Sequence, residues 1–550
     1  MTRENLFLGV DVGTGSARAG LFDGTGQMVS TAACPIRLWR EGENIVEQSS
    51  ADIWAAVCRA VAQAIGLAGV DMHCVKGIGF AATCSLVVVG RQGNPLTTSL
   101  TANLTGDPVR DVIVWMDHRA ADQAQRINMT GGAPLAYVGN CISPEMQLPK
   151  LLWLKENLPD SFAQAQAFMD LTDYLTWRAT GSATRSSCTL TCKWTYLPHL
   201  GGWDAGFFES VGLGCLAADG FGRIGTVVAA PGAALGQGLS VLSAQELGLL
   251  PGTPVAAGLI DAHAGGLGSL PPAPLDGTDG GVQVAYVFGT SACLMVSSAT
   301  PVQVPGIWGP YWSAMLPDTW LLEGGQTAAG AAIDFVLRGH PAWGQACADA
   351  TADGKSLLAW LERRVAARHP SLSPAAVDAA RMHYIVDFAG NRSPLADPAA
   401  RGLVSGQSLS NDVLSLEQTY IAAVLGVAYG ARHMLAALQT AGLTAPQIVI
   451  SGGAAKSPLV RQLLADATGV PVARPMAAEP VLLGAAMLGA VAAGSKAGLD
   501  NARSDMVTLQ DVTHPNPDMT RFHDWKFRAY RMLQDTERQL WADYDRGNDA

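Results

Sequence analysis

The chain lacks the features of a nucleic-acid-binding or membrane protein. Its 550 residues contain 36 Lys and Arg against 47 Asp and Glu, a formal net charge of −11, and the basic residues form no cluster. Binding to a phosphate backbone needs a basic stripe, so a nucleic-acid partner is not expected. The most apolar segment, 481–494, is shorter than the roughly 20 residues that span a bilayer. The N-terminal apolar run is too short for a signal peptide, and we expect a cytoplasmic protein with no membrane contact.

Cysteine pairs with metal-binding spacing are also missing. None of the 10 cysteines forms a C-x-x-C pair. Cys188 and Cys192 are four residues apart in CTLTC, but no second pair or nearby histidine completes a metal set. We therefore expect free, buried thiols in a reducing compartment rather than zinc sites or disulfides.

Apolar residues are abundant: 49% of the chain is hydrophobic and only 15% is charged. This composition is typical of a globular protein with much buried surface. Because 550 residues exceed what one core can organise, two large domains are expected, and three are possible.

The stretch LFLGVDVGTGSARAGLFD, residues 6–23, predicts a hairpin, since apolar runs flank a glycine-rich tip. The tip is either a tight turn that needs glycine for its positive φ or a cradle for a phosphate. In the second interpretation Asp11 holds the Mg²⁺ that accompanies a polyphosphate. The Walker A pattern is absent. The residues of this tip are Gly13, Thr14, Gly15 and Ser16.

A second stretch, VAYVFGTSACLMVSS at 284–298, repeats the same pattern. Its tip is Gly289, Thr290 and Ser291. Two such hairpins far apart suggest a duplicated domain with one phosphate-binding tip in each half, and they favour the phosphate interpretation.

The rest of the pattern is α/β. A strand at 75–80 and a continuation of its sheet at 85–89 are expected. QIVISGGAAKSPLVRQLLADATG predicts a strand, a Gly-Gly turn and a helix with Ser457 as N-cap and Gly469 as its end. Helices are expected at 52–67, 148–157, 171–178 and 417–438, and a helix that docks on a domain is expected in the charged, aromatic tail from about 500.

Asp261, in GLIDAHAGGLG, follows an apolar strand and precedes a glycine-rich helix start. A carboxylate there can act as a general base toward a substrate hydroxyl, or it can be an N-cap. With two phosphate-binding tips in the chain, the base is favoured. His263 is interpreted as a packing residue, because no nucleophile motif accompanies it.

Two further groups of residues indicate ligand contacts. EGGQTAAGAAID (323–334) and SGGAAKSP (451–458) are glycine-rich turns that could pass close to a flat ligand such as adenine. Polar residues of the first half suggest a site for a small polyol, and the candidates are Trp115, Asp117, Glu145 and Lys193.

These motifs, in this order, resemble the FGGY carbohydrate kinases, the sugar-kinase branch of the actin and hexokinase superfamily. They are DVGTGSAR, WMDHRA, SPEMQLPKLLWLKE, GLIDAHAGGLG, FGTSACL, EGGQTAAG and SGGAAKSP. The resemblance covers about 6–495. CTLTCKWTY and SPEMQLPK look most like the D-ribulose kinase group.

The resemblance implies an α/β fold of two ribonuclease H-like domains with a cleft between them. The N-terminal domain, 1–265, would bind sugar and carry the first phosphate loop. The C-terminal domain, 266–495, would carry the second loop and the adenosine site, and 496–550 would be a helical tail packed on the body.

The resemblance also implies ATP and Mg²⁺ as cofactors and a small sugar as substrate, and a homodimer is a family-level possibility. It places Asp261 as the catalytic base and Asp11 at the metal. The nucleotide residues would be Gly13, Thr14, Gly15, Ser16, Gly289, Thr290, Ser291, Gln326, Gly452 and Gly453. The sugar residues would be Ala82, Thr83, Trp115, Asp117, Glu145, Lys193 and Asp261.

The expected reaction is phosphorylation of a pentulose by ATP, D-ribulose to D-ribulose 5-phosphate. The alternatives are a kinase for L-ribulose, xylulose, ribitol or glycerol, and, more distantly, an actin-like ATP-binding protein without sugar kinase activity. One departure bears on the substrate: in GIGFAATCSL this chain has Ala81, where related pentulose kinases often have aspartate.

Overall fold

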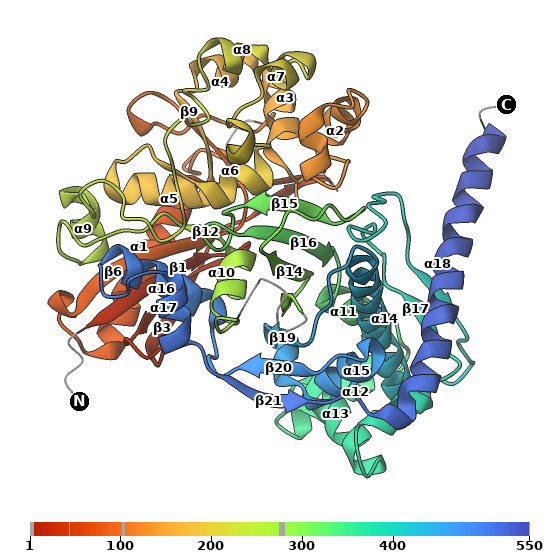
Figure 1. Cartoon of the computed structure of the whole chain (residues 1–550). Coiled ribbons are helices and arrows are strands. Elements are labelled where there is room, and N and C mark those ends of the chain that lie inside the picture. Colours follow the sequence, from red (N-terminus) through yellow and green to blue (C-terminus); the bar gives the residue numbers. More distant parts are fainter. Residues whose placement is uncertain (1–4, 43, 102–104, 274–280, 549–550) are drawn as a thin grey trace.

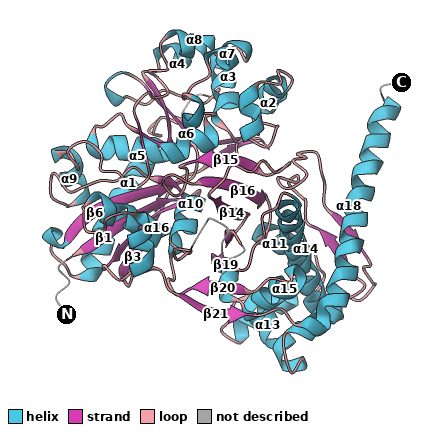
Figure 2. Cartoon of the chain, viewed as in Figure 1, coloured by secondary structure: helices cyan, strands magenta, loops and turns pink. Residues whose placement is uncertain are grey.

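Two α/β bodies make up the protein (Figure 1). The computed structural model describes residues 5–42, 44–101, 105–273 and 281–548. The first half of the chain forms one body and most of the second half forms the other, and both contain helices and strands (Figure 2).

The first predicted hairpin is the centre of a five-stranded sheet. Strand β1 (Leu6–Val12) pairs antiparallel with β2 and parallel with β6, which confirms the hairpin. The order across the sheet is β12-β6-β1-β2-β3. The other strands are β2 (Ser16–Phe22), β3 (Met28–Pro35), β6 (Val75–Ala82) and β12 (Leu259–Ile260).

The second predicted hairpin is the centre of a seven-stranded sheet with the order β15-β16-β14-β13-β19-β20-β21. Its five middle strands repeat the arrangement of the first sheet: three antiparallel strands followed by two parallel ones. The predicted duplication is therefore confirmed. The strands are β13 (Gln283–Phe288), β14 (Ala292–Ser298), β15 (Trp308–Trp312), β16 (Trp320–Gln326), β19 (Ile448–Ser451), β20 (Val472–Pro475) and β21 (Leu509–Thr513).

Residues 85–89 do not continue the sheet of β6, so that prediction is wrong. They form β7 (Leu86–Val89), which lies in a separate five-stranded sheet of order β4-β5-β8-β7-β9. The Ser85 amide donates to the Thr83 carbonyl at 2.8 Å, and this tight turn sends the chain out of the first sheet. The other strands are β4 (Trp39–Glu41), β5 (Ile45–Gln48), β8 (Val112–Ile113) and β9 (Ala167–Asp170).

Helix α16 (Pro480–Ala492) comes from the second half of the chain but covers the first sheet. A Cβ at Gly9 would lie 2.0 Å from the Leu482 carbonyl oxygen, and one at Gly79 would lie 1.9 Å from that of Ala485. Glycine in β1 and β6 thus lets the helix backbone rest directly on the strands. By packing, this part of the expected C-terminal segment belongs to the first body.

The predicted helices are confirmed. Ser457 accepts a hydrogen bond from the Val460 amide at 3.0 Å as the N-cap of α15, and Gly469 ends that helix in the left-handed region at φ 73°. The helices with these predictions are α1 (Ser50–Ala68), α3 (Gln147–Asn157), α5 (Leu171–Thr180), α14 (Val413–Thr440) and α15 (Pro458–Thr468).

The tail contains more than a helix. After α17 (Leu499–Met506), strand β21 extends the second sheet, which the sequence did not predict. Helix α18 (Thr520–Asn548) docks through buried residues such as His523 and Tyr530, while Trp541 near its far end is half exposed. Docking of the tail helix is thus confirmed for its first half.

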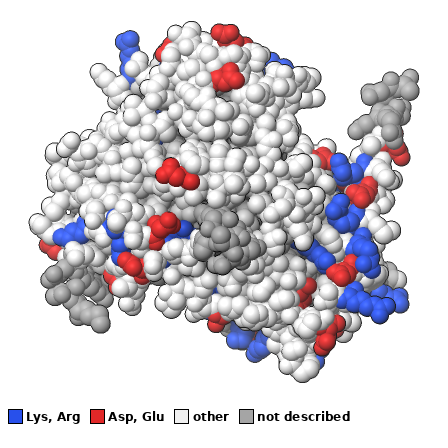
Figure 3. Space-filling view, viewed as in Figure 1, with Lys and Arg blue, Asp and Glu red and all other residues white. Residues whose placement is uncertain are grey.

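Two helices, α1 and α14, are long and apolar enough to cross a membrane by length and composition. The protein buries 78% of the apolar 18-residue stretch of α14 and 44% of the corresponding stretch of α1. Both helices pack in the hydrophobic cores of their bodies. The face in Figure 3 shows no continuous basic patch: blue and red side chains alternate along α18 at the right.

Candidate active site

Asp261 is the first residue of α10 (Asp261–Leu267), directly after β12. Desolvation raises the pKa of its carboxyl to about 7, and the negative charge of Asp11 acts in the same direction. The Ala262 amide donates to its Oδ1 at 2.7 Å, which opposes the rise. A carboxyl with a pKa near neutrality can accept a proton and release it again, as a general base must.

Asp11 lies near the end of β1 and is 1% exposed. Arg18 donates to its Oδ2 from Nε at 2.9 Å and also from Nη2, and Arg18 pairs with Glu479 at 2.7 Å. Burial raises the pKa of the Asp11 carboxyl in spite of Arg18. Its buried Oδ1 accepts no hydrogen bond from any residue that the structure describes. A carboxylate oxygen left free beside a second carboxylate fits the expected Mg²⁺ ligand.

Each glycine tip is closed by a backbone hydrogen bond across the turn. The Gly13 amide donates to the Ser16 carbonyl at 3.0 Å, and the Gly289 amide donates to the Ser291 carbonyl at 2.9 Å. A Cβ at Gly15 would meet nothing within 4 Å, so this tip has room for a ligand. Thr14 is fixed from the side, because its hydroxyl accepts from Trp115 Nε1 at 3.0 Å.

Beside the second tip lies a cavity of about 560 Å³, a size that suits a nucleoside. Gly289, Thr290 and Gly453 line it, as do side chains of α11 (Gly330–Arg338). Gly452 turns the chain at φ 88°, and a Cβ there would lie 2.5 Å from the Phe288 carbonyl oxygen. The turn therefore requires glycine.

Gln326 does not line this cavity, and its nucleotide contact stays a prediction. It is buried in the core of the second body. Its Oε1 accepts from the Tyr286 hydroxyl at 2.7 Å, and its Nε2 donates to the Val427 carbonyl at 3.2 Å. With both ends of the amide engaged, Gln326 ties β13, β16 and α14 together.

Lys193, at the end of α6 (Ser187–Lys193), is buried and pairs with Glu323 of β16 at 3.3 Å. Its ammonium lies 4.5 Å from the centre of the Trp308 ring. Although desolvation opposes ionisation, Lys193 holds the pKa of the Glu323 carboxyl well below its usual range. Sequence reasoning missed Glu323, which begins the EGGQT motif and was considered only as part of a glycine-rich turn.

Glu145 pairs with Arg392, and both carboxylate oxygens lie 3.2 Å from Nη2. The Arg392 guanidinium lies 6.0 Å from the Trp115 ring centre and 5.4 Å from that of Trp308. Three predicted sugar-side residues, Trp115, Glu145 and Lys193, thus gather around Trp308. Arg392 lies in an irregular segment without any sequence signal.

Ala82 and Thr83 lie where β6 ends. Ala82 is paired in register with Ile260, the residue before Asp261, and the Thr83 amide donates to the Val12 carbonyl at 3.0 Å. Both predicted sugar residues therefore lie at the C-terminal ends of the parallel strands, the same end of the sheet at which Asp11 and Asp261 lie.

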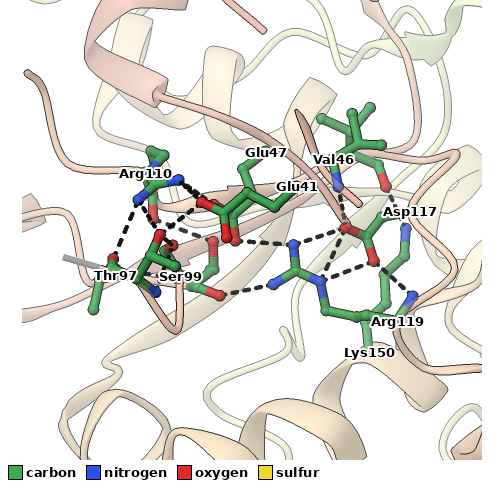
Figure 4. A network of polar contacts seen from close by, with 12 residues as sticks. Glu41, Val46, Glu47, Thr97, Ser99, Arg110, Asp117, Arg119 and Lys150 are labelled. Carbon is green, nitrogen blue, oxygen red and sulfur yellow. Dashed lines mark hydrogen bonds and ion pairs between the residues drawn. The ribbon is translucent and has the colours of Figure 1, made fainter. Parts of the chain in front are cut away.

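Unlike these residues, Asp117 belongs to a buried polar network in which both of its carboxylate oxygens accept hydrogen bonds (Figure 4). The Val46 amide donates to Oδ2 at 2.6 Å, and Arg119 donates to both oxygens at 2.7–2.9 Å. Arg119 also pairs with Glu47 at 2.9 Å. With 0% exposure, Asp117 fixes the loop that carries Trp115, and the prediction of a sugar contact is corrected.

His263 also corrects the sequence analysis. It lies beside the two cysteines of CTLTC, with Nδ1 at 3.1 Å from Cys188 Sγ. The expectation that no histidine accompanies these thiols is wrong, because the fold brings together residues 75 positions apart.

The fold and this site define a two-domain α/β protein of the actin and hexokinase type, with paired glycine tips and a carboxylate at the sheet edge. The chain belongs to the FGGY family of carbohydrate kinases. The family's N-terminal domain matches residues 6–268 and its C-terminal domain matches residues 284–493.

Similar proteins span nearly the whole chain. An FGGY carbohydrate kinase domain-containing protein of Homo sapiens is 43% identical over 98% of both chains. A D-ribulokinase of Saccharomyces cerevisiae is 36% identical over 88% of this chain and 72% of its own. The crystal structure of xylulose kinase from Rhodospirillum rubrum has a TM-score of 0.78 at 21% identity, covering 98% of this chain and all of that one.

Proposed function

We propose that the protein phosphorylates a pentulose with ATP, converting D-ribulose to D-ribulose 5-phosphate. Membership of the carbohydrate kinase family establishes the phosphotransferase class. The substrate rests on one observation, the 36% identity to a D-ribulokinase. Two buried ion pairs, Lys193–Glu323 and Glu145–Arg392, support a small polyhydroxylated substrate, because such groups offer both donors and acceptors to hydroxyls. The charge of Glu323 acts on Asp261.

In the proposed reaction the terminal sugar hydroxyl attacks the γ-phosphorus of ATP. The Asp261 carboxylate accepts the hydroxyl proton as the new O–P bond forms and the bond to ADP breaks. Backbone amides and hydroxyls at the two glycine tips, 13–16 and 289–291, orient the phosphates and stabilise the charge on their oxygens. Arg18 holds Asp11 in place.

Asp11, with its unpartnered Oδ1, would hold Mg²⁺, which when bound neutralises charge on the phosphate oxygens. The chain's own part is to keep that oxygen free. The Arg18 contact to Oδ2 does so by fixing the carboxylate from one side.

Ala81 bears on which pentulose fits. It is 0% exposed and pairs in register with Asp11 and Leu259. An aspartate at this position would add a carboxylate to the core beneath the site, so the alanine leaves this edge less acidic. The proposal of D-ribulose includes the prediction that this alanine is compatible with turnover.

Product analysis tests the proposal. The full chain is incubated with Mg·ATP and D-ribulose, and the product is examined by ³¹P NMR with proton coupling. We expect a phosphomonoester coupled to the two protons of a terminal methylene group. A signal of inorganic phosphate alone, at the same rate with and without sugar, would instead favour an actin-like ATPase.

A further inference from the structure

Two cysteines and one histidine meet beside Asp261. Cys188 and Cys192 lie one turn apart on α6, so their side chains share one face of the helix. His263 lies on α10, two residues after Asp261. The two sulfurs and an imidazole nitrogen all lie within 4.8 Å of one another, and all three residues are fully buried.

This set of donors matches a thiophilic divalent cation. Tetrahedral zinc binds sulfur at about 2.3 Å and nitrogen at about 2.0–2.1 Å, which puts ligand atoms roughly 3.5–3.8 Å apart. Cys188 Sγ is 3.1 Å from His263 Nδ1, so a bound ion would move these two atoms slightly apart. Thiolate is a soft ligand and imidazole a borderline one, and both favour zinc-like ions over Mg²⁺.

Glu323 lies beside the His263 ring and favours the tautomer that can bind such an ion. Its Oε2 lies 3.5 Å from His263 Nε2, the ring nitrogen that does not contact Cys188, and Nε2 has no hydrogen-bond partner among the described residues. A carboxylate beside Nε2 favours the tautomer with the proton there, so the lone pair of Nδ1 faces Cys188. Carboxylate support behind a histidine ligand is a common feature of zinc sites.

The charges also balance. Without an ion, Cys188 Sγ and His263 Nδ1 lie within hydrogen-bonding distance of each other, at 3.1 Å. Binding of the cation would release the thiol protons, and two thiolates with one divalent cation sum to zero charge. A neutral group is the form that a buried site tolerates best.

We propose that Cys188, Cys192 and His263 form a binding site for one thiophilic divalent cation, with Zn²⁺ as the representative, and that its occupation inhibits phosphoryl transfer. Inhibition is expected because the ligands lie on the same short helices as Asp261 and Lys193. Asp261 begins the helix that carries His263, and Lys193 directly follows Cys192, so the shift of the ligand atoms to the separations that the ion requires displaces both. The inhibitory part rests on the proposed function, whereas metal binding does not.

Cobalt binding tests the site without reference to activity. The reduced, metal-free full chain is titrated with Co²⁺, and we expect one ion per chain with a thiolate-to-cobalt charge-transfer band that Zn²⁺ abolishes. The double variant Cys188→Ser/Cys192→Ser should lose the band. The matched control Cys215→Ser, at an exposed cysteine, should keep it. A wild-type chain without the band, or a double variant that retains it, would overturn the site.

A second measurement uses the wild-type chain alone, in case the double variant does not fold. X-ray absorption of the protein with one equivalent of Zn²⁺ should show two sulfur ligands at about 2.3 Å. A shell of nitrogen and oxygen alone would overturn the proposal.

Inhibition is measured as sugar-dependent ADP release under buffered free Zn²⁺ with excess Mg·ATP. We expect at least a tenfold loss in the wild type and in Cys215→Ser. Equal rates with and without Zn²⁺ would refute the inhibitory part. A thiolate band in a chain that never releases ADP with sugar would leave the metal site standing and remove the proposed function.

Discussion

Replacement of Asp261 by asparagine tests the assignment of the base. Asparagine has nearly the same shape, and its amide oxygen can still accept from the Ala262 amide, which donates at 2.7 Å to the native carboxylate. What is lost is the ability to take a proton. The variant also removes a negative charge whose interaction with Asp11 contributes to the raised pKa of Asp261, so we expect no loss of stability.

The expected loss of turnover follows from the role of a general base. Such groups contribute about 10²–10⁴-fold, which at about 1.4 kcal/mol per tenfold is roughly 3–6 kcal/mol of barrier. Because the carboxyl has a pKa of about 7, most of the wild-type enzyme carries the active form at a pH of about 8. At that pH the assay therefore compares a wild-type enzyme whose Asp261 is ionised with a variant that has no base at this position.

The assay is coupled ADP release with Mg·ATP and D-ribulose, alongside ADP affinity by calorimetry. Asp261→Asn should lose turnover and retain ADP affinity, since Asp261 does not line the nucleotide cavity. The matched control Asp122→Asn, at an exposed aspartate of α2 (Ala121–Asn128), should behave as wild type. Turnover of Asp261→Asn within about threefold of wild type would refute the assignment.

Three further predictions follow. Gly452→Ala should weaken ADP binding and lower stability by at least about 2 kcal/mol. Its backbone, at φ 88° and ψ −171°, lies in a region essentially confined to glycine, which costs another residue about 1–3 kcal/mol, and its Cβ would meet the Phe288 carbonyl oxygen. Unchanged ADP affinity in calorimetry would contradict this. Glu145→Gln leaves Arg392 buried without its counter-charge, so thermal unfolding should occur at lower temperature and Arg392→Met should restore part of the loss; additive effects of the two changes would argue against the pair. The kcat/KM for sugar should rise with pH up to about 7 and then level, because only the ionised Asp261 accepts a proton; a flat profile from pH 5.5 to 8.5 would exclude it as the titrating base.

The sequence predicted the parts of the fold that local patterns encode. Both hairpins were recognisable because apolar strands and glycine tips lie within 20 residues of each other, and α15 because its capping residues are contiguous. The place of residues 86–89 could not be predicted in the same way. A buried apolar strand reads the same in any sheet, and here the turn at Thr83 and Ser85 decides which sheet it joins.

The candidate site was predictable only in part, for the same reason. Asp261 and Asp11 follow apolar strands, and that position is visible in the sequence. The partners that set their surroundings come from distant segments: Arg392 meets Glu145 across 247 positions and Glu323 meets Lys193 across 130. Asp117 was misjudged because a polar residue in a tryptophan-containing loop looks the same whether it faces a ligand or a buried arginine.

The most direct test of the central claim is a comparison of sugars under identical conditions. ADP release by the full chain with Mg·ATP is measured with D-ribulose, L-ribulose, D-xylulose, L-xylulose, ribitol and glycerol, each over a range of concentrations. A pentulose kinase specific for D-ribulose should give sugar-dependent release with the highest kcat/KM for D-ribulose. A rate that is the same with every sugar and with none would contradict the account, and selective turnover of another member of the set would replace the proposed substrate with that one.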